Sequence, residues 1–128
     1  MAKKAKTAKP AGTRRAAIAI KRVYDEPGKA DGLRILIDRL WPRGLAKSKL
    51  KLDAWVKHLA PSNALRKWYR HDPEKFSEFR KRYVAELKAQ GGELDELRKA
   101  VKGSTVTLLT ATKELELSHA TVLRELLG

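Results

Sequence analysis

The chain has 128 residues, 42% of them hydrophobic, with no cysteine and a formal net charge of +14. This length predicts one domain with a single core. The lack of cysteine excludes disulfides, thiolate metal sites and cysteine nucleophiles, and it fits a reducing compartment, so we expect a cytoplasmic location. No apolar run approaches the ~20 residues that cross a bilayer, and we expect no membrane partner.

The positive charge is divided between a tail and the rest of the chain. Residues 1–15 contain six Lys and Arg residues and no acid, which leaves +8 of the +14 on the remainder. This Lys-, Ala- and Thr-rich segment cannot bury enough apolar surface to offset its ordering entropy. We therefore predict a disordered basic tail at 1–15 and a single α/β domain at 16–128. A field of this sign attracts nucleic acid and other anions.

Three strands are predicted in the first half of the chain. Apolar and polar residues alternate over residues 17–24, whereas residues 33–38 are apolar on both faces in the middle, as in a central strand. Pro27 and Gly32 indicate a loop between them. A period of two over residues 50–57 favours a third strand, with a short helix as the alternative.

Helix signals dominate the segment between residues 62 and 101. Ser62 is a suitable N-cap for a first helix that ends near residue 70. Asp72 caps a second helix, in which Pro73 takes the first position, where its missing N–H costs nothing. The periodic apolar residues of this second helix and of a third, shorter helix are Phe76, Phe79, Tyr83, Leu87, Leu94, Leu97 and Val101.

The C-terminal part predicts one more strand and one more helix. Residues 105–110 are rich in β-branched side chains, and residues 120–127 form a helical pattern with Ser118 as a possible cap. The order of elements predicts an α/β fold with a small, partly parallel sheet flanked by helices. Open α/β sheets bind ligands beyond the carboxyl ends of their strands, so we expect a site at that edge.

Basic side chains follow three of the predicted strands. If these strands are parallel, the basic groups meet at one rim, where Arg holds phosphate or carboxylate through two parallel hydrogen bonds and a helix N-terminus adds N–H donors. The alternative is that Arg39 and Arg43 pair with nearby acids, and that the aromatic residues pack in the core. The expected ligand-binding residues are Arg39, Trp41, Arg43, Lys57, Arg66, His71, Arg82, Tyr83, Lys113 and His119.

Two side chains are candidates for chemistry. Asp38 is a carboxylate at the exit of a central strand, and His119 lies near a helix start, where the dipole favours a neutral imidazole that can act as a base. The three histidines show no metal-ligand spacing, so no metal is predicted. Glycine-rich phosphate loops and nucleophile elbows are absent, so we predict no cofactor, and whether the protein is an enzyme stays open.

Three stretches carry a resemblance to a known family. They are residues 20–25, residues 37–44 with the sequence I-D-R-L-W-P-R-G, and residues 55–62 with the sequence W-V-K-H-L-A-P-S. From about residue 20 to the C-terminus the chain resembles the domain of unknown function 488 family, in its YeaO-like branch. The resemblance implies a compact, cytosolic, bacterial-type α/β domain and no established activity. The family's Asn-His-Ala element has Ser118 here in place of the asparagine.

Two functions follow from these patterns. The first is binding of an anionic small molecule that carries phosphate or carboxylate, with an enzymatic step on a nucleotide-like ligand left open. The alternative is a non-specific nucleic-acid-binding accessory protein that uses the basic tail and surface, with an affinity that falls steeply as salt rises. A purely structural partner-binding module is a third reading.

Overall fold

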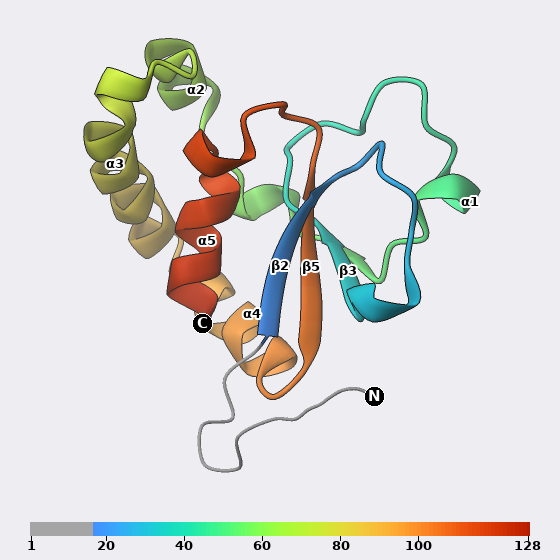
Figure 1. Ribbon diagram of the computed structural model, residues 1–128. Coiled ribbons are helices and arrows are strands. Elements are labelled where there is room, and N and C mark those ends of the chain that lie inside the picture. The colour runs from blue at the N-terminus through green and yellow to red at the C-terminus, as the bar shows by residue number, and fades with distance from the viewer. Residues whose placement is uncertain (1–16) are drawn as a thin grey trace.

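Four short strands form one parallel sheet in the structure, a computed structural model in which residues 17–128 are described. The tail predicted at residues 1–15 lies outside the described residues. The strand order is β2-β5-β3-β4, and every pairing is parallel (Figure 1). The strands are β2 (Ala17–Arg22), β3 (Leu33–Leu36), β4 (Ala54–Trp55) and β5 (Thr105–Thr110).

Strand β5 lies in the middle because it pairs with β2 on one side and with β3 on the other. Its side chains alternate between two apolar layers: Leu108 belongs to the larger core cluster and Leu109 to the smaller one, and both are fully buried. Burial on both faces is typical of parallel strands that are covered by helices or loops on each side. The β-branched pattern predicted a strand at residues 105–110, and this prediction is confirmed.

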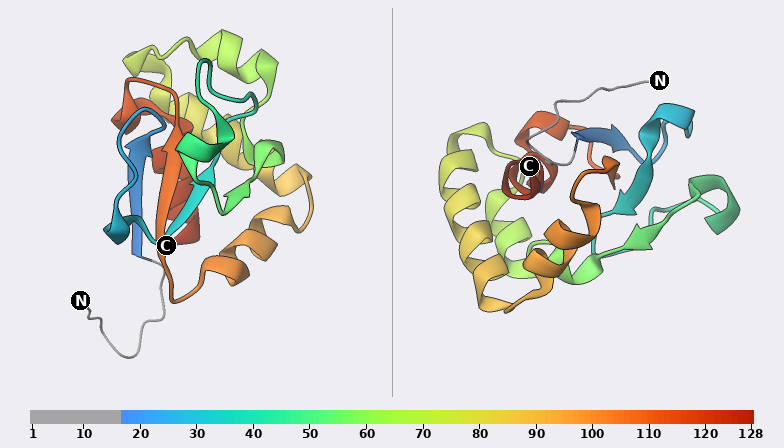
Figure 2. Two further views of the ribbon diagram at one scale, coloured as in Figure 1. Left: turned by 90° about the vertical axis from the view of Figure 1, so that its right-hand side faces the viewer. Right: turned by 90° about the horizontal axis from the view of Figure 1, so that it is seen from below.

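Helices cover one face of the sheet, and loops with one short helix cover the other (Figures 1 and 2). The larger core, on the first face, includes Ile35, Phe79 and Leu123. The smaller core, on the second face, is built on Leu36 and Leu50. The helices are α1 (Lys47–Leu50), α2 (Asn63–Tyr69), α3 (Phe76–Ala89), α4 (Glu93–Val101) and α5 (His119–Leu127). Short 3-10 turns occupy Lys29–Asp31, Lys57–Leu59, Pro73–Lys75 and Leu115–Leu117.

The predicted helix starts are confirmed by their hydrogen bonds. The hydroxyl of Ser62 accepts from the amide of Leu65 at 3.1 Å, and the hydroxyl of Ser118 accepts from the amide of Ala120 at 3.2 Å. The Asp72 carboxylate accepts from the next turn in the same way. These side chains satisfy amides that have no partner within the first turn of a helix.

The third predicted strand, residues 50–57, is mostly wrong. Leu50 ends α1, Lys51 adopts a left-handed conformation (φ 52°), and only Ala54–Trp55 pairs with β3. The period of two arises because Leu50 and Leu52 pack against the smaller core from a helix end and a turn. Neither the strand nor the alternative short helix spans this segment, because α1 shares only Leu50 with it and β4 covers only Ala54–Trp55.

The path of the chain opens a space between β3 and β5. After β3 the chain passes to the face that carries α1, whereas after β5 it passes to the face that carries α5 (Figure 2). Neighbouring strand ends whose connections diverge in this way leave a crevice at the carboxyl edge. Within residues 17–128, no helix has both the length and the apolar content needed to span a membrane.

Candidate functional site

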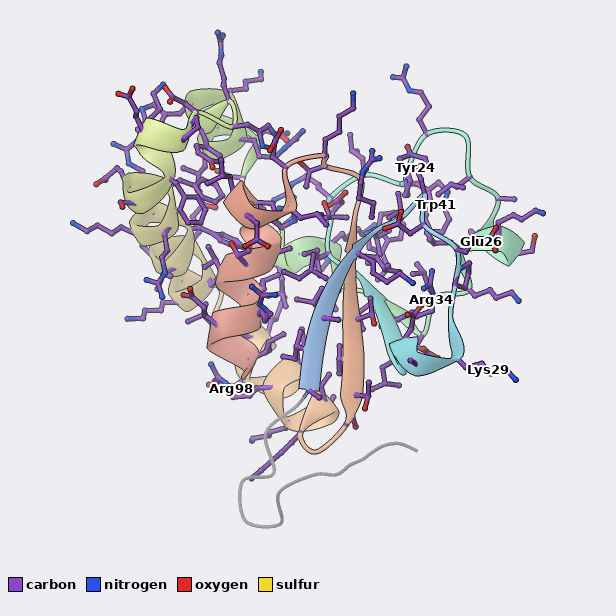
Figure 3. The ribbon with its side chains drawn as sticks, in the orientation of Figure 1. Tyr24, Glu26, Lys29, Arg34, Trp41 and Arg98 are labelled. Carbon is purple, nitrogen blue, oxygen red and sulfur yellow. The ribbon has the colours of Figure 1, made fainter. Side chains whose placement is uncertain are left out.

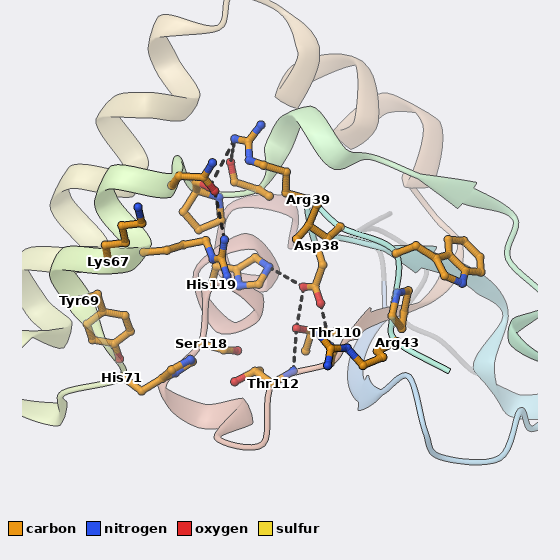
Figure 4. Close-up of a pocket in the computed structure, with 18 of the residues that line it drawn as sticks. Asp38, Arg39, Arg43, Lys67, Tyr69, His71, Thr110, Thr112, Ser118 and His119 are labelled. Atoms are coloured by element: carbon orange, nitrogen blue, oxygen red, sulfur yellow. Dashed lines mark hydrogen bonds and ion pairs between the residues drawn. The ribbon is translucent and has the colours of Figure 1, made fainter. Parts of the chain in front are cut away.

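A cleft of about 610 Å³ lies beyond the carboxyl ends of β3 and β5 (Figure 4). Most of its lining comes from residues 38–43 after β3, from residues between 60 and 67 around the start of α2, and from residues 110–112, 118 and 119 at the end of β5 and the start of α5. This is the edge at which the sequence predicted a site. The volume lies within the range of small-molecule sites in proteins, about 300–1,000 Å³.

Asp38 is the centre of a hydrogen-bond network in this cleft (Figure 4). Its Oδ1 atom accepts from the hydroxyl of Thr110 at 2.7 Å, and its Oδ2 atom accepts from the backbone amide of Ala111 at 2.8 Å. The Nε2 atom of His119 lies 3.2 Å from Oδ1. Three donors from the end of β5 and the start of α5 thus hold one carboxylate that follows β3.

The surroundings of Asp38 keep it ionised. Burial by itself raises the pKa of this carboxyl, but the hydrogen bond and charge of His119 and the donors at Ala111 and Thr110 outweigh it, so the pKa lies below its usual 3.8. A carboxylate with both oxygens engaged is a poor proton acceptor. At neutral pH the ionised Asp38 therefore connects the end of β3 to the end of β5 and to the start of α5.

The two oxygens near Nε2 of His119 determine its tautomer. That nitrogen lies 3.1 Å from the carbonyl oxygen of Ile37 and 3.2 Å from Oδ1 of Asp38, and both atoms are acceptors at neutral pH. In the neutral form of the ring the proton therefore sits on Nε2. The ring is also held by an edge-to-face contact with Tyr83, with centroids 6.1 Å apart.

Four cations line the cleft, and within residues 17–128 none of them makes an ion pair. The Nε atom of Arg39 is buried without a hydrogen-bond partner, and its Nη2 atom makes only long contacts of 3.4 Å to the carbonyls of Ala60 and Pro61. Asp38 is the single acidic residue among the lining residues. The cations are Arg39, Arg43, Arg66 and Lys67.

In the described part of the chain, Arg39 and Arg43 make no ion pair with the nearby acids, which is the alternative that the sequence left open. Glu78 pairs with Arg82 on α3, and Glu86 accepts hydrogen bonds from the amide and hydroxyl of Ser62. Asp38 is engaged by His119 and its neighbours. The acids that could neutralise the cleft are therefore committed elsewhere, and the cleft carries an excess of positive charge.

A family model described as "Inactive DUF488-N3 subclade" matches residues 17–128 of the chain. The chain belongs to this DUF488 subclade. The resemblance to the domain of unknown function 488 family is thereby confirmed.

This DUF488-N3 chain is similar to curated proteins of Mycobacterium tuberculosis and Escherichia coli. The uncharacterized protein Rv3073c of Mycobacterium tuberculosis (strain H37Rv) is 45% identical over 111 residues, which is 87% of this chain and 93% of the relative. The uncharacterized protein YeaO of Escherichia coli K12 is 43% identical over 108 residues, 84% of this chain and 94% of the relative. No solved structure gives a significant match.

The DUF488-N3 fold brings most of the predicted site residues together, although they come from four separate segments. His71 joins them from the turn after α2, where it adopts a left-handed conformation (φ 55°). The predicted residues that line the cleft are Asp38, Arg39, Trp41, Arg43, Arg66, His71 and His119.

Four predicted residues do not line the cleft, each for a local reason. Lys57 lies in a 3-10 turn with its ammonium 5.1 Å from the ring centre of Trp55. Arg82 pairs with Glu78, and its guanidinium lies 4.1 Å from the ring centre of Trp68. Tyr83 is fully buried in the core, and Lys113 is exposed.

Tyr83 is buried in the core, where it packs against His119, a residue that lines the cleft. Its hydroxyl donates to the carbonyl of Leu59, and its ring contacts that of His119. Burial, together with the charges of Glu86 and Asp38, raises its pKa well above the usual 10. It is therefore a neutral hydrogen-bond donor at physiological pH and has no surface that a ligand could reach.

Sequence reasoning missed Thr110, the amide of Ala111, Tyr24 and Lys67 as parts of the cleft. One signal was available for Thr110, since it is a polar residue at the end of a strand that is apolar on both faces. Within residues 17–128, no group of three or more His, Cys, Asp or Glu side chains is placed to hold a metal.

Proposed function

We propose that this DUF488-N3 protein binds a small anionic ligand, through a phosphate or carboxylate group, in the cleft between β3 and β5. The observation that carries the proposal is the group of cations without acidic partners, above all Arg39 with its buried and unsatisfied Nε atom. A buried donor without a partner costs about 1–3 kcal/mol. A bound anion would remove that cost once the Arg39 side chain turns this atom toward it.

The positions of the arginines favour a directed contact over diffuse attraction. Arg39 and Arg43 follow the same strand, and Arg66 lies one turn into α2 on the facing wall. Guanidinium groups form two parallel hydrogen bonds with phosphate or carboxylate, which fixes the orientation of the ligand. The cleft therefore offers an anion several directed donors from opposite sides.

We propose that the protein binds this anion without catalysing a reaction on it. The subclade is described as inactive. Asp38 accepts hydrogen bonds from Thr110 and Ala111, lies 3.2 Å from Nε2 of His119 and has a lowered pKa, so it is poorly suited to move a proton. We propose that Asp38 and His119 organise the cleft and that the arginines hold the ligand.

Calorimetric titration of the full-length protein tests this proposal. Pyrophosphate and citrate are titrated separately at constant ionic strength into the wild type, Arg39→Ala, Arg43→Ala and Arg80→Ala. Arg80 is a matched control, because its side chain is exposed and pairs with Glu125 away from the cleft. Each cleft variant should weaken binding about tenfold or more, the value of one charge-assisted hydrogen bond. The control should bind as the wild type does.

Comparison of the two probes identifies the anion class. Tighter binding of pyrophosphate assigns a phosphate-bearing ligand, and tighter binding of citrate assigns a carboxylate-bearing one. Equal binding by all four proteins would show that the anions bind elsewhere on the basic surface, and the proposal would fail.

A further inference from the structure

We infer that the ligand is a mononucleotide-like anion whose planar base stacks on the ring of Tyr24. This inference rests on the proposed function and adds a second recognition element to the same cleft. The arginines hold the phosphate, and Tyr24 selects for a flat ring attached to it.

The exposed apolar surface of residues 17–128 gathers at this cleft. The large apolar side chains with substantial exposure are Tyr24 at 47%, Leu40 at 70% and Trp55 at 37%. Tyr24 and Leu40 line the cleft beside the arginines. Trp55 packs edge-on against Trp41, another lining residue, with centroids 5.5 Å apart. Exposed apolar surface concentrated beside polar groups marks a ligand-binding groove.

Tyr24 is held in place on one side while much of its ring stays open. The guanidinium of Arg22 lies 5.1 Å from the ring centre, and it is fixed in turn by hydrogen bonds to the carbonyls of Ala111 and Thr112, each 3.1 Å long. The Tyr24 hydroxyl donates to the carbonyl of Arg43 at 3.2 Å. A ring fixed before binding loses little conformational entropy when a base stacks on it.

The same contacts connect the ring to the anion-binding arginines. Arg43 belongs to the loop after β3, so the bond from Tyr24 joins the turn after β2 to the loop that carries the cations. Figure 3 shows Tyr24 near Trp41, which belongs to the same loop as Arg43. A ligand that contacts both must combine an anion with a flat ring. The cleft volume of about 610 Å³ leaves room for a base, a sugar and a phosphate.

Trp41 and Tyr83, the aromatic residues that the sequence predicted to bind the ligand, are less suited to stack on a base than Tyr24 is. The indole nitrogen of Trp41 donates to the carbonyl of Leu45 at 2.7 Å, and its ring packs against the smaller core and Trp55. Tyr83 has no exposed surface. Among these three aromatic residues, Tyr24 alone both lines the cleft and is exposed, at 47%.

The test compares two ligands that differ only in the base. Adenosine 5′-monophosphate and ribose 5-phosphate are titrated into the full-length protein by calorimetry at constant ionic strength. The nucleotide should bind at least about fivefold more tightly, the lower end of what one base stacked on an aromatic ring contributes. Tyr24→Leu should abolish this ratio. Tyr24→Phe keeps the ring and should keep the ratio.

Each outcome separates this inference from the proposed function. Equal binding of the two ligands by the wild type overturns the stacking inference and leaves anion binding intact. If neither they nor pyrophosphate bind, the proposed function fails as well. A single-stranded oligonucleotide that binds more tightly than the mononucleotide, with a steep salt dependence, would make the cleft a nucleic-acid surface and overturn the inference. Should Tyr24→Leu fail to fold, the wild-type ratio still decides.

Discussion

His119 and Asp38 connect the start of α5 to the end of β3, with Nε2 of the imidazole 3.2 Å from Oδ1 of the carboxylate. The same carboxylate reaches Thr110 and Ala111 at the end of β5. One acidic side chain thus ties together the three segments whose divergence opens the cleft. We expect this residue to set the geometry of the site and to contribute to the stability of the fold in a pH-dependent way.

Asp38→Asn should destabilise the protein at neutral pH and matter less in acid. The pKa of Asp38 is lowered in the folded state, so its stabilising contribution is present above the usual value of 3.8 and is lost as the pH falls through the folded pKa. We expect a loss of about 1–3 kcal/mol at pH 7, measured by urea denaturation. The difference between wild type and variant should shrink below pH 3.8. A difference that is constant from pH 7 to pH 2.5 would contradict this account.

Gly32→Ala should be far more destabilising than Gly91→Ala. Both glycines have left-handed φ angles, 65° and 82°, but a Cβ at Gly32 would lie 2.1 Å from the carbonyl oxygen of Thr105, whereas nothing lies within 4 Å at Gly91. Alanine at Gly91 should cost about 1–2 kcal/mol from backbone strain alone. At Gly32 we expect more than about 3 kcal/mol, because β5 must move. Similar melting temperatures for the two variants would contradict the close approach of Gly32 to the Thr105 carbonyl at the start of β5.

Arg34→Ala should remove a buried support of the second face of the sheet. Arg34 is 5% exposed, pairs with Asp31, and donates twice to the carbonyl of Leu50 at the end of α1. Breaking a buried pair on one side costs about 3–5 kcal/mol. Lys21 also reaches Asp31, at 3.1 Å, but it is partly exposed. Lys21→Ala should therefore cost under about 1 kcal/mol in the same denaturation experiment. Equal losses of unfolding free energy in the two variants would show that the burial of the Arg34–Asp31 pair does not matter for stability.

Tyr83→Phe should lower stability without changing ligand affinity. The variant keeps the packing of the ring and removes the hydroxyl that donates to the buried carbonyl of Leu59. We expect a loss of about 1 kcal/mol in urea denaturation. Anion titration should give the wild-type affinity, because Tyr83 does not line the cleft. Weakened binding with unchanged stability would restore Tyr83 as a ligand contact.

Local signals in the sequence were sufficient for most elements. Ser62, Asp72 and Ser118 act on amides two or three residues away, so their caps are visible in the sequence itself. Because open α/β sheets bind ligands beyond the carboxyl ends of their strands, the sequence also predicted that Asp38 and His119 lie at the same edge of the sheet. The strand predicted at residues 50–57 was mostly wrong, because Leu50 and Leu52 both pack against the smaller core without being in a strand. Their spacing of two residues is the same as that of a strand face.

Other parts of the site depend on neighbours that are distant in the sequence. Tyr24 reaches the cleft because β2 lies beside β5, which no local pattern reveals. Whether an arginine forms an ion pair depends on which acids lie near it in the fold. Arg82 pairs with Glu78 one helical turn away, whereas Arg39 has no acidic partner within residues 17–128. Sequence patterns predicted where cations gather, and only the packing of the chain decided which of them remain available.

Titration of the full-length protein with pyrophosphate, followed by ¹⁵N chemical shifts, tests the central claim most directly. We predict that the largest changes occur at the Nε signal of Arg39 and at the amides of Ala111 and His119, which surround the cleft. Changes spread over the exposed lysines of α3 and α4, such as Lys81 and Lys99, with none at the cleft, would contradict it.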